Sequence, residues 1–151
     1  MHFLKSLAES LQNNSGFFDV IEKHVRLIFM ANSKKTLVLG ASDNPARYSY
    51  LAIQRLRNHG HPVAGIGRKN TKVGDVVIDK EKQPIPDVDT VTLYLNPRHQ
   101  QEYYDYIVSL KPKRIIFNPG TENDELEKIA KDNNIQTLEA CTLVMLSTGQ
   151  Y

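Results

Sequence analysis

The chain of 151 residues carries 19 Lys and Arg against 17 Asp and Glu, for a formal net charge of +2, and 40% of its residues are hydrophobic. This size and composition are typical of a single globular domain whose core needs no disulfide or metal ion to stabilise it. A charge this small and this evenly spread indicates neither a nucleic-acid partner nor a membrane partner. Any basic site must therefore be local.

Cysteine usage and hydropathy also limit the protein class. The one cysteine, Cys141, cannot form an internal disulfide, and a lone thiol is typical of a reducing compartment, so we expect a cytoplasmic protein. The longest apolar runs fall far short of the roughly 20 residues that a membrane-spanning helix needs. No spacing of ionisable residues predicts a metal site.

Residues 1–33 differ in pattern from the rest of the chain. Apolar residues recur at helical spacing in residues 3–11 and again in residues 17–29, and polar residues separate the two stretches. The pattern predicts two short helices, of which the first would use Phe3, Leu4, Leu7, Ala8 and Leu11. A polar break follows, and Met30 is an alternative start residue. We interpret residues 1–33 as a helical N-terminal extension, either accessory or part of the core.

From residue 34 to residue 151, short apolar strands alternate with helices. The strands are predicted at residues 36–39, 62–66, 75–78, 90–95, 113–117 and 135–139, and the helices at 48–58, 97–110, 123–133 and 142–146. Parallel neighbouring strands require crossover connections of this kind, and the crossovers cover both faces of the sheet. The fold class predicted is α/β, with a doubly wound parallel sheet.

Ligands of such sheets bind beyond the carboxyl ends of the strands, where the strand order reverses. The first loop there begins with Gly40, Ala41 and Ser42, whose small side chains allow the backbone to approach a diphosphate beside the next helix. The full Gly-x-Gly-x-x-Gly pattern is absent, because Ser42 and Pro45 stand near the positions of its later glycines. A turn glycine followed by a helix start is the alternative interpretation.

The loop after the second strand contains Gly67, Arg68 and Lys69. A site for a nicotinamide dinucleotide usually has an acidic residue here, which binds the ribose hydroxyls. Two cations instead favour a phosphorylated ribose, either the 2′-phosphate of NADP or the 3′-phosphate of coenzyme A. The alternative is a pair of solvated surface cations.

Several loops together resemble a known family. The stretch from Thr36 to Arg47, then Arg68 with Lys69, Asn118-Pro119-Gly120 and Glu139-Ala140-Cys141 resemble the small stand-alone CoA-binding proteins. These are similar to the CoA-binding domain of the succinyl-CoA synthetase alpha subunit, which is Rossmann-like. The resemblance covers about residues 34–151. The chain departs from the family pattern in its N-terminal extension and at Ile66-Gly67, where the family usually has Asn-Pro.

The resemblance implies a role for each matching loop. Gly40, Ala41 and Ser42 would hold the CoA diphosphate, and Lys69, with help from Arg68, would meet the phosphorylated adenosine. The cleft would be lined by Asn96 and Pro97, and the pantetheine arm would lie beside Asn118, Pro119 and Gly120.

The main functional hypothesis is a non-catalytic module that binds CoA or an acyl-CoA as a carrier or sensor. The phosphohistidine of the synthetase lies in a following domain, and His59, His61 and His99 are expected to be surface residues. The alternative is an NADP-dependent oxidoreductase, which the missing glycines and the lack of a catalytic Tyr-Lys pair disfavour. A third hypothesis is an interaction protein whose nucleotide site has decayed. The expected partner is thus a small molecule, and any protein partner is unknown.

Overall fold

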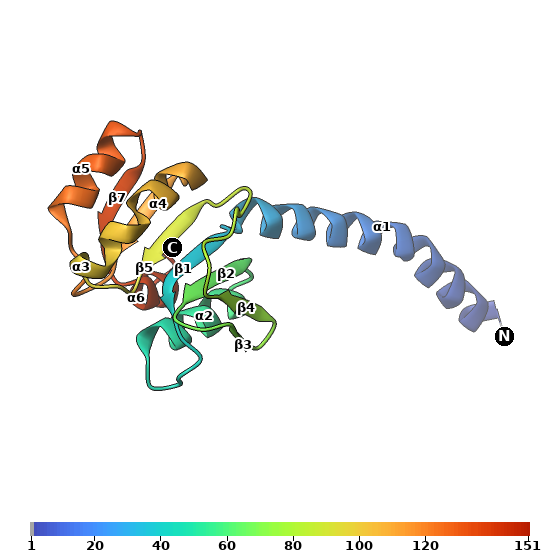
Figure 1. Ribbon diagram of the computed structural model, residues 1–151. Helices are drawn as coiled ribbons and strands as arrows, with labels where there is room; N and C mark the ends of the chain where they lie inside the picture. Colours follow the sequence, from blue (N-terminus) through green and yellow to red (C-terminus); the bar gives the residue numbers. More distant parts are fainter. Residues whose placement is uncertain (1) are drawn as a thin grey trace. The chain divides into compact units, whose positions relative to one another are not determined.

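The computed structural model describes residues 2–151, and of residues 3, 4 and 6–13 it describes the backbone alone. The chain divides into two units, Met1–Ser33 and Lys34–Tyr151. In the first unit the described residues form one continuous helix, α1 (His2–Asn32), shown in blue in Figure 1. The prediction of two short helices is therefore wrong. The polar residues before Gly16 each cost a helix only a few tenths of a kcal/mol and the glycine about 1 kcal/mol, and no proline interrupts the run. The apolar pattern predicted for Phe3 to Leu11 concerns side chains outside the described ones.

The second unit is built on a seven-stranded sheet with the order β3-β4-β2-β1-β5-β6-β7. All neighbouring strands are parallel except β3 and β4, so the predicted doubly wound α/β fold is confirmed as a mostly parallel sheet. The strands are β1 (Thr36–Ala41), β2 (Val63–Gly67), β3 (Thr71–Val73), β4 (Val76–Asp79), β5 (Thr90–Leu93), β6 (Arg114–Phe117) and β7 (Gln136–Glu139). The order reverses between β1 and β5, which places the expected ligand site at their carboxyl ends.

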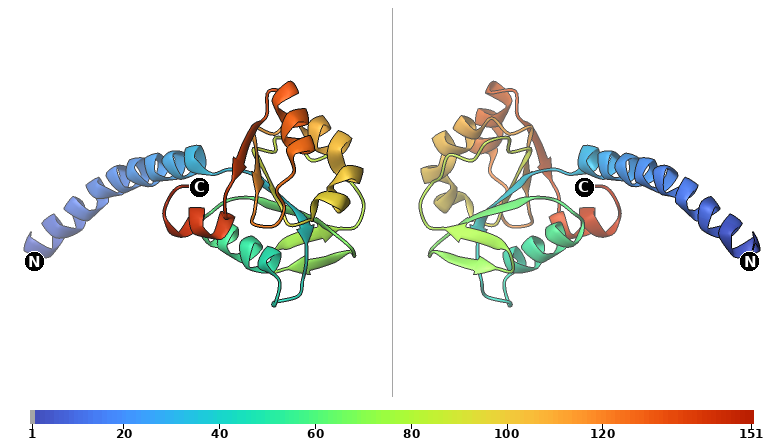
Figure 2. Two further views of the ribbon diagram at one scale, coloured as in Figure 1. Left: turned by 90° about the vertical axis from the view of Figure 1, so that its left-hand side faces the viewer. Right: turned by 90° about the vertical axis from the view of Figure 1, so that its right-hand side faces the viewer.

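Helices cover both faces of this sheet, as the two views of Figure 2 show. The helices are α2 (Tyr48–Asn58), α3 (Pro97–Gln100), the 3₁₀ turn η1 (Gln101–Tyr103), α4 (Tyr104–Leu110), α5 (Asp124–Asp132) and α6 (Thr142–Ser147). The protein has two hydrophobic cores, one on each face of the sheet, and successive residues of β1 point into them in turn. Leu37 and Leu39 pack with α4 and α5, and Val38 packs with α2 and α6. This alternation is expected of a central strand buried on both faces.

Two local predictions differ from the structure. Strand β3 was not predicted, and it pairs antiparallel with β4 through a turn at Gly74, where φ is +59°. Three residues of mixed polarity are too short to show a strand period, so only the pairing partner stabilises β3. The helix predicted at 97–110 is divided by η1. Its buried Gln100 donates hydrogen bonds to the carbonyls of Leu95 and Thr121, and a periodic pattern does not reveal such contacts.

Two glycines allow the ends of β5 and β2 to lie close to the end of β1. Gly40 has a φ of +92°, and a Cβ atom there would lie 2.8 Å from the backbone of Tyr94. A Cβ atom on Gly67 would lie 2.2 Å from the carbonyl oxygen of Ala41. Glycine at position 67, one of the family departures, is thus required by the contact between β1 and β2.

Candidate functional site

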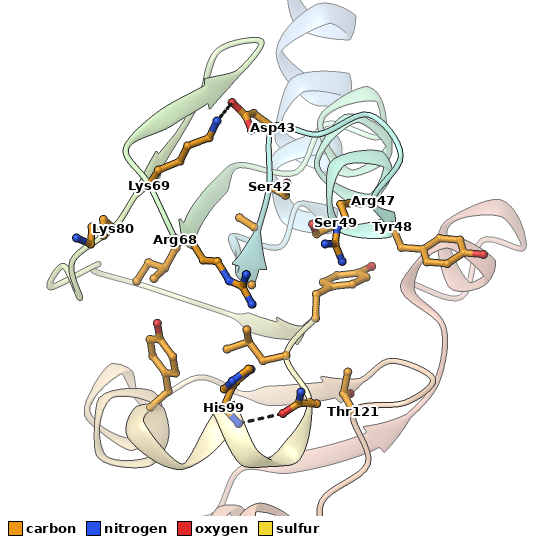
Figure 3. A pocket seen from close by; sticks show the side chains of 18 of the residues that line it. Ser42, Asp43, Arg47, Tyr48, Ser49, Arg68, Lys69, Lys80, His99 and Thr121 are labelled. Atoms are coloured by element: carbon orange, nitrogen blue, oxygen red, sulfur yellow. Dashed lines mark hydrogen bonds and ion pairs between the residues drawn. The ribbon is translucent and has the colours of Figure 1, made fainter.

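A pocket of about 1080 Å³ lies at the carboxyl ends of the parallel strands (Figure 3). Its walls come from the segments that follow β1, β2, β4, β5 and β6, together with the first residues of α2. These segments converge because parallel strands all end at the same edge of a sheet. The pocket therefore occupies the place that the strand order predicts for a ligand.

Most of the predicted binding residues meet in this pocket. Its lining includes Gly40, Ala41, Ser42, Arg68, Lys69, Asn96, Pro119 and Gly120. The other two candidates, Pro97 and Asn118, are not part of the lining. Pro97 is the first residue of α3, whose N-cap Asn96 accepts a hydrogen bond from the His99 amide at 3.1 Å.

Asn118 is buried, and its side chain is fully engaged within the protein. Its Nδ2 donates to Thr92 Oγ1 at 2.7 Å and to the Leu93 carbonyl at 2.9 Å, and its Oδ1 accepts from the Thr142 amide at 2.9 Å. These bonds connect β5, the end of β6 and the start of α6. Asn118 therefore positions the turn at Pro119 and Gly120, and both N–H groups of its amide are already used within the protein.

The two cations after β2 have different surroundings. Lys69 Nζ lies 3.1 Å from Asp43 Oδ2, and the Thr71 hydroxyl donates to the same oxygen at 2.8 Å. The hydrogen bonds from Thr71 and then from Lys69 hold the pKa of the Asp43 carboxyl below its usual value. Arg68 makes no ion pair with any described residue, and its guanidinium points into the pocket (Figure 3).

The pocket contains further ionisable residues that sequence reasoning did not select. They are three cations, Arg47, Lys80 and Lys82, three carboxylates, Asp43, Glu81 and Glu102, and His99, so that with Arg68 and Lys69 the lining holds five cations and three carboxylates. Lys82 Nζ lies 5.1 Å from the centre of the Tyr103 ring, a cation–π contact. The excess of cations over carboxylates in the lining favours an anionic ligand. A sequence signal existed for Arg47 alone, because it is a cation at the predicted start of a helix.

Of the three histidines predicted at the surface, His59 and His99 are exposed and His61 is buried. His99 lines the pocket and is exposed. His61 is only 7% exposed, which contradicts its prediction as a surface residue. Its Nδ1 accepts a hydrogen bond from the Lys34 amide at 2.9 Å, and its ring contacts that of Tyr151. These partners are distant in sequence, so the helix-end pattern around Gly60 could not reveal them.

Comparison with known families identifies the second unit. The family described as CoA binding domain matches residues 34–147. The chain belongs to this CoA-binding-domain family. The resemblance seen in the loops of the sequence is thereby confirmed, as is the Rossmann-like fold.

Solved structures support the same family architecture. A crystal structure of an uncharacterized protein is 55% identical, has a TM-score of 0.77, and is matched over 79% of this chain and 98% of that chain. A hypothetical protein from Pyrococcus horikoshii OT3 shares the fold at 24% identity and a TM-score of 0.71, over 83% and 89% of the two chains. No curated protein matches the sequence.

A larger enzyme contains a similar fold. A dinucleotide forming acetyl-coenzyme A synthetase 1 of Ca. Korarchaeum cryptofilum, in complex with phosphate and ADP, is 18% identical with a TM-score of 0.58. The match covers 72% of this chain and 26% of that enzyme's chain. Within residues 2–151, no helix is long and apolar enough to cross a membrane, and no cluster of three or more His, Cys, Asp or Glu side chains could hold a metal ion.

Proposed function

We propose that the protein binds coenzyme A or an acyl-CoA in the pocket at the carboxyl ends of β1, β2, β5 and β6. The observation that carries this proposal is the pair of cations, Arg68 and Lys69, at the strand end where a nicotinamide dinucleotide site has an acid. CoA carries a 3′-phosphate on the adenosine ribose, and cations stabilise such a group. The family of the chain supports the same ligand.

The proposed placement follows the loops. The diphosphate lies against Gly40, Ala41 and Ser42, close to the start of α2, and the 3′-phosphate lies beside Lys69 and Arg68. The pantetheine arm passes Asn96, Pro119 and Gly120. Pro97 and Asn118 act indirectly, since they hold α3 and the turn after β6 in position. A pocket of about 1080 Å³ has room for a ligand of this size.

We further propose that the module carries, senses or presents its ligand without chemistry of its own, in the cytoplasm. One of the tyrosines that line the pocket supports this view, because burial raises the pKa of Tyr94 well above the ordinary value of a tyrosine. Its hydroxyl stays protonated and is a poor general acid or base there.

A thermal-shift panel tests the ligand. CoA and acetyl-CoA are expected to raise the unfolding temperature of the full chain more than dephospho-CoA does, because a ligand that binds the native state stabilises it by mass action. NADP and NAD complete the panel. A shift with NADP and none with CoA would transfer the assignment to an NADP-dependent oxidoreductase. No shift with any of the five ligands would indicate a decayed site in an interaction protein.

A further inference from the structure

Helix α1 carries apolar side chains that are largely open to solvent. Between Phe17 and Met30, its large apolar side chains are 42% to 65% exposed. A monomeric protein rarely exposes a contiguous apolar patch, and such a patch usually marks a binding surface. Most of the stability of a helix in a protein comes from the packing of its apolar face. We therefore looked for the partner that this face fits.

The apolar residues of α1 form a seam with the spacing of a coiled coil. Successive positions of the seam are alternately three and four residues apart, over four heptads from residue 4 to residue 32. Its side chains from Asn14 onward are described, and all of them are exposed. A spacing sustained over this length is typical of helices that pair with one another. The positions of the seam are Leu4, Leu7, Leu11, Asn14, Phe18, Ile21, Val25, Ile28 and Asn32.

The two asparagines of the seam indicate which partner fits. When two identical helices pair parallel and in register, each position of the seam faces the same position of the other helix. Apolar side chains then meet apolar ones, and Asn14 meets a second Asn14, whose amide can both donate and accept a hydrogen bond. An apolar partner of another kind would leave the Asn14 amide buried without a hydrogen bond, which costs free energy.

A lipid surface fits this helix less well than a second helix does. Helices that lie on membranes are rich in Lys and Arg on their polar face, which anionic lipids attract. Residues 17–32 of α1 instead contain two acids, Asp19 and Glu22, and two cations, Lys23 and Arg26. With His24 neutral, this stretch has no net charge.

We propose that α1 is a dimerisation helix, which pairs parallel and in register with α1 of a second copy of the chain through this seam. The apolar positions Phe18, Ile21, Val25 and Ile28 pack against their counterparts, and the asparagines fix the register. The dimer carries two of the pockets described above. No residue of the seam lines the pocket, so the proposal stands independently of the ligand.

Sedimentation equilibrium on the full chain tests the pairing. The wild type is expected to have twice the chain mass of 17.2 kDa at micromolar concentrations. Val25→Glu is expected to weaken dimerisation at least about a hundredfold, because it buries unpaired carboxylates in the seam. The matched control is Val20→Glu, the same change on a side chain that is 55% exposed, against 59% for Val25, but lies off the seam. It should change the dissociation constant by no more than about threefold.

Disulfide trapping tests the register. In a Cys141→Ser background, Ile21→Cys places one thiol in the seam of each copy, and a parallel dimer in register brings the two thiols together. Oxidised glutathione should therefore convert this variant to a covalent dimer. Val20→Cys in the same background is the control and should remain uncoupled. A covalent dimer that forms only when Ile21→Cys is mixed with Val25→Cys would show an antiparallel pair and overturn the proposed arrangement.

Other outcomes would overturn the proposal itself. A monomeric wild type, a larger assembly, or a dimer that Val25→Glu leaves intact would each do so, and CoA binding by the same protein would leave the proposed function untouched. Vesicles of phosphatidylcholine and phosphatidylserine provide a further arm. If they bound a monomeric wild type but not Val25→Glu, the apolar face would be assigned to lipid. Urea unfolding of the variants provides the folding control, since both valines are exposed.

Discussion

Lys69 would meet a ligand phosphate while already paired with a carboxylate. Asp43 accepts from both Lys69 and the Thr71 hydroxyl, and the pair is largely open to solvent. Solvent screens such a pair, so it stabilises the fold little and a phosphate with two negative charges can compete for the lysine. In the proposed site, the residue that would distinguish CoA from dephospho-CoA is therefore already held in an ion pair.

Lys69→Ala is expected to weaken CoA binding by about tenfold to a hundredfold, the scale of one hydrogen bond to a charged group, and by less where solvent screens the contact. Dephospho-CoA should bind the variant and the wild type almost equally, because it lacks the 3′-phosphate. Calorimetry with both ligands measures the coupling between residue and phosphate. Asp43→Asn is the matched variant and should improve CoA relative to dephospho-CoA. Equal losses for both ligands in Lys69→Ala would show that this lysine acts elsewhere.

His61 links stability to pH, at a place outside the pocket. Burial lowers its pKa from the ordinary value of 6.5, and the positive charges of Lys34, His59 and Arg114 lower it further, whereas Asp89 acts in the opposite direction. The unfolded chain therefore takes up the proton first as the pH falls. The stability that neutral His61 provides is complete above pH 6.5 and is lost below it, toward the folded-state pKa.

Urea unfolding between pH 7.5 and pH 5 should accordingly show a falling free energy of unfolding for the wild type. One proton contributes a slope of at most about 1.4 kcal/mol per pH unit. His61→Phe keeps a ring against Tyr151 but cannot titrate, so it should be less stable at pH 7.5 and less sensitive to acid. Identical pH slopes for the two proteins would contradict this prediction.

At the scale of elements, Asn118 connects β5, β6 and α6 below the floor of the pocket. Asn118→Ala would leave the Thr142 amide and the Leu93 carbonyl without partners in the core. We expect a loss of about 2 to 4 kcal/mol in the free energy of unfolding, measured with urea. Asn58→Ala, at an exposed position in the last turn of α2, is the control and should change stability little. A small effect of Asn118→Ala would mean that the network contributes little.

Helix α1 is the element that the proposed site does not use. Its described apolar side chains between Phe17 and Met30 are at least 42% exposed, and the complete sheet lies in the second unit. A shortened chain that begins at Met30 is therefore expected to unfold cooperatively and to bind CoA with the affinity of the full chain. Urea unfolding and calorimetry check both points. Loss of cooperative unfolding would place residues 1–29 in the core.

At the scale of the whole molecule, the proposal is a binding module rather than a ligase. The chain matches only 26% of the length of the similar synthetase chain. The purified protein, given CoA, acetate and ATP, is expected to show no sustained release of ADP or AMP, since the proposed contacts serve binding alone. A coupled spectrophotometric assay measures this. Turnover that His99→Ala abolishes would overturn the binding-module proposal, because His99 is the histidine in the pocket lining.

The sequence by itself determined the sheet and the place of the pocket. Apolar runs such as residues 36–39 and 113–117 are local signals in the sequence. Strands that alternate with helices pair in parallel, because the helix returns the chain to the same edge of the sheet. The order of the loops then determines which segments meet at one edge. For that reason most candidate residues, including Arg68 and Pro119, line the pocket.

Only the tertiary structure decided how individual side chains are used. The edge strand β3 forms only by pairing with β4, and the Asn118 side chain is part of a buried hydrogen-bond network. Lys69 forms an ion pair with Asp43, which lies 26 residues earlier in the chain. Periodicity records which face of an element is apolar, but a hydrogen bond or an ion pair depends on atoms from distant segments that only folding brings within about 3 Å.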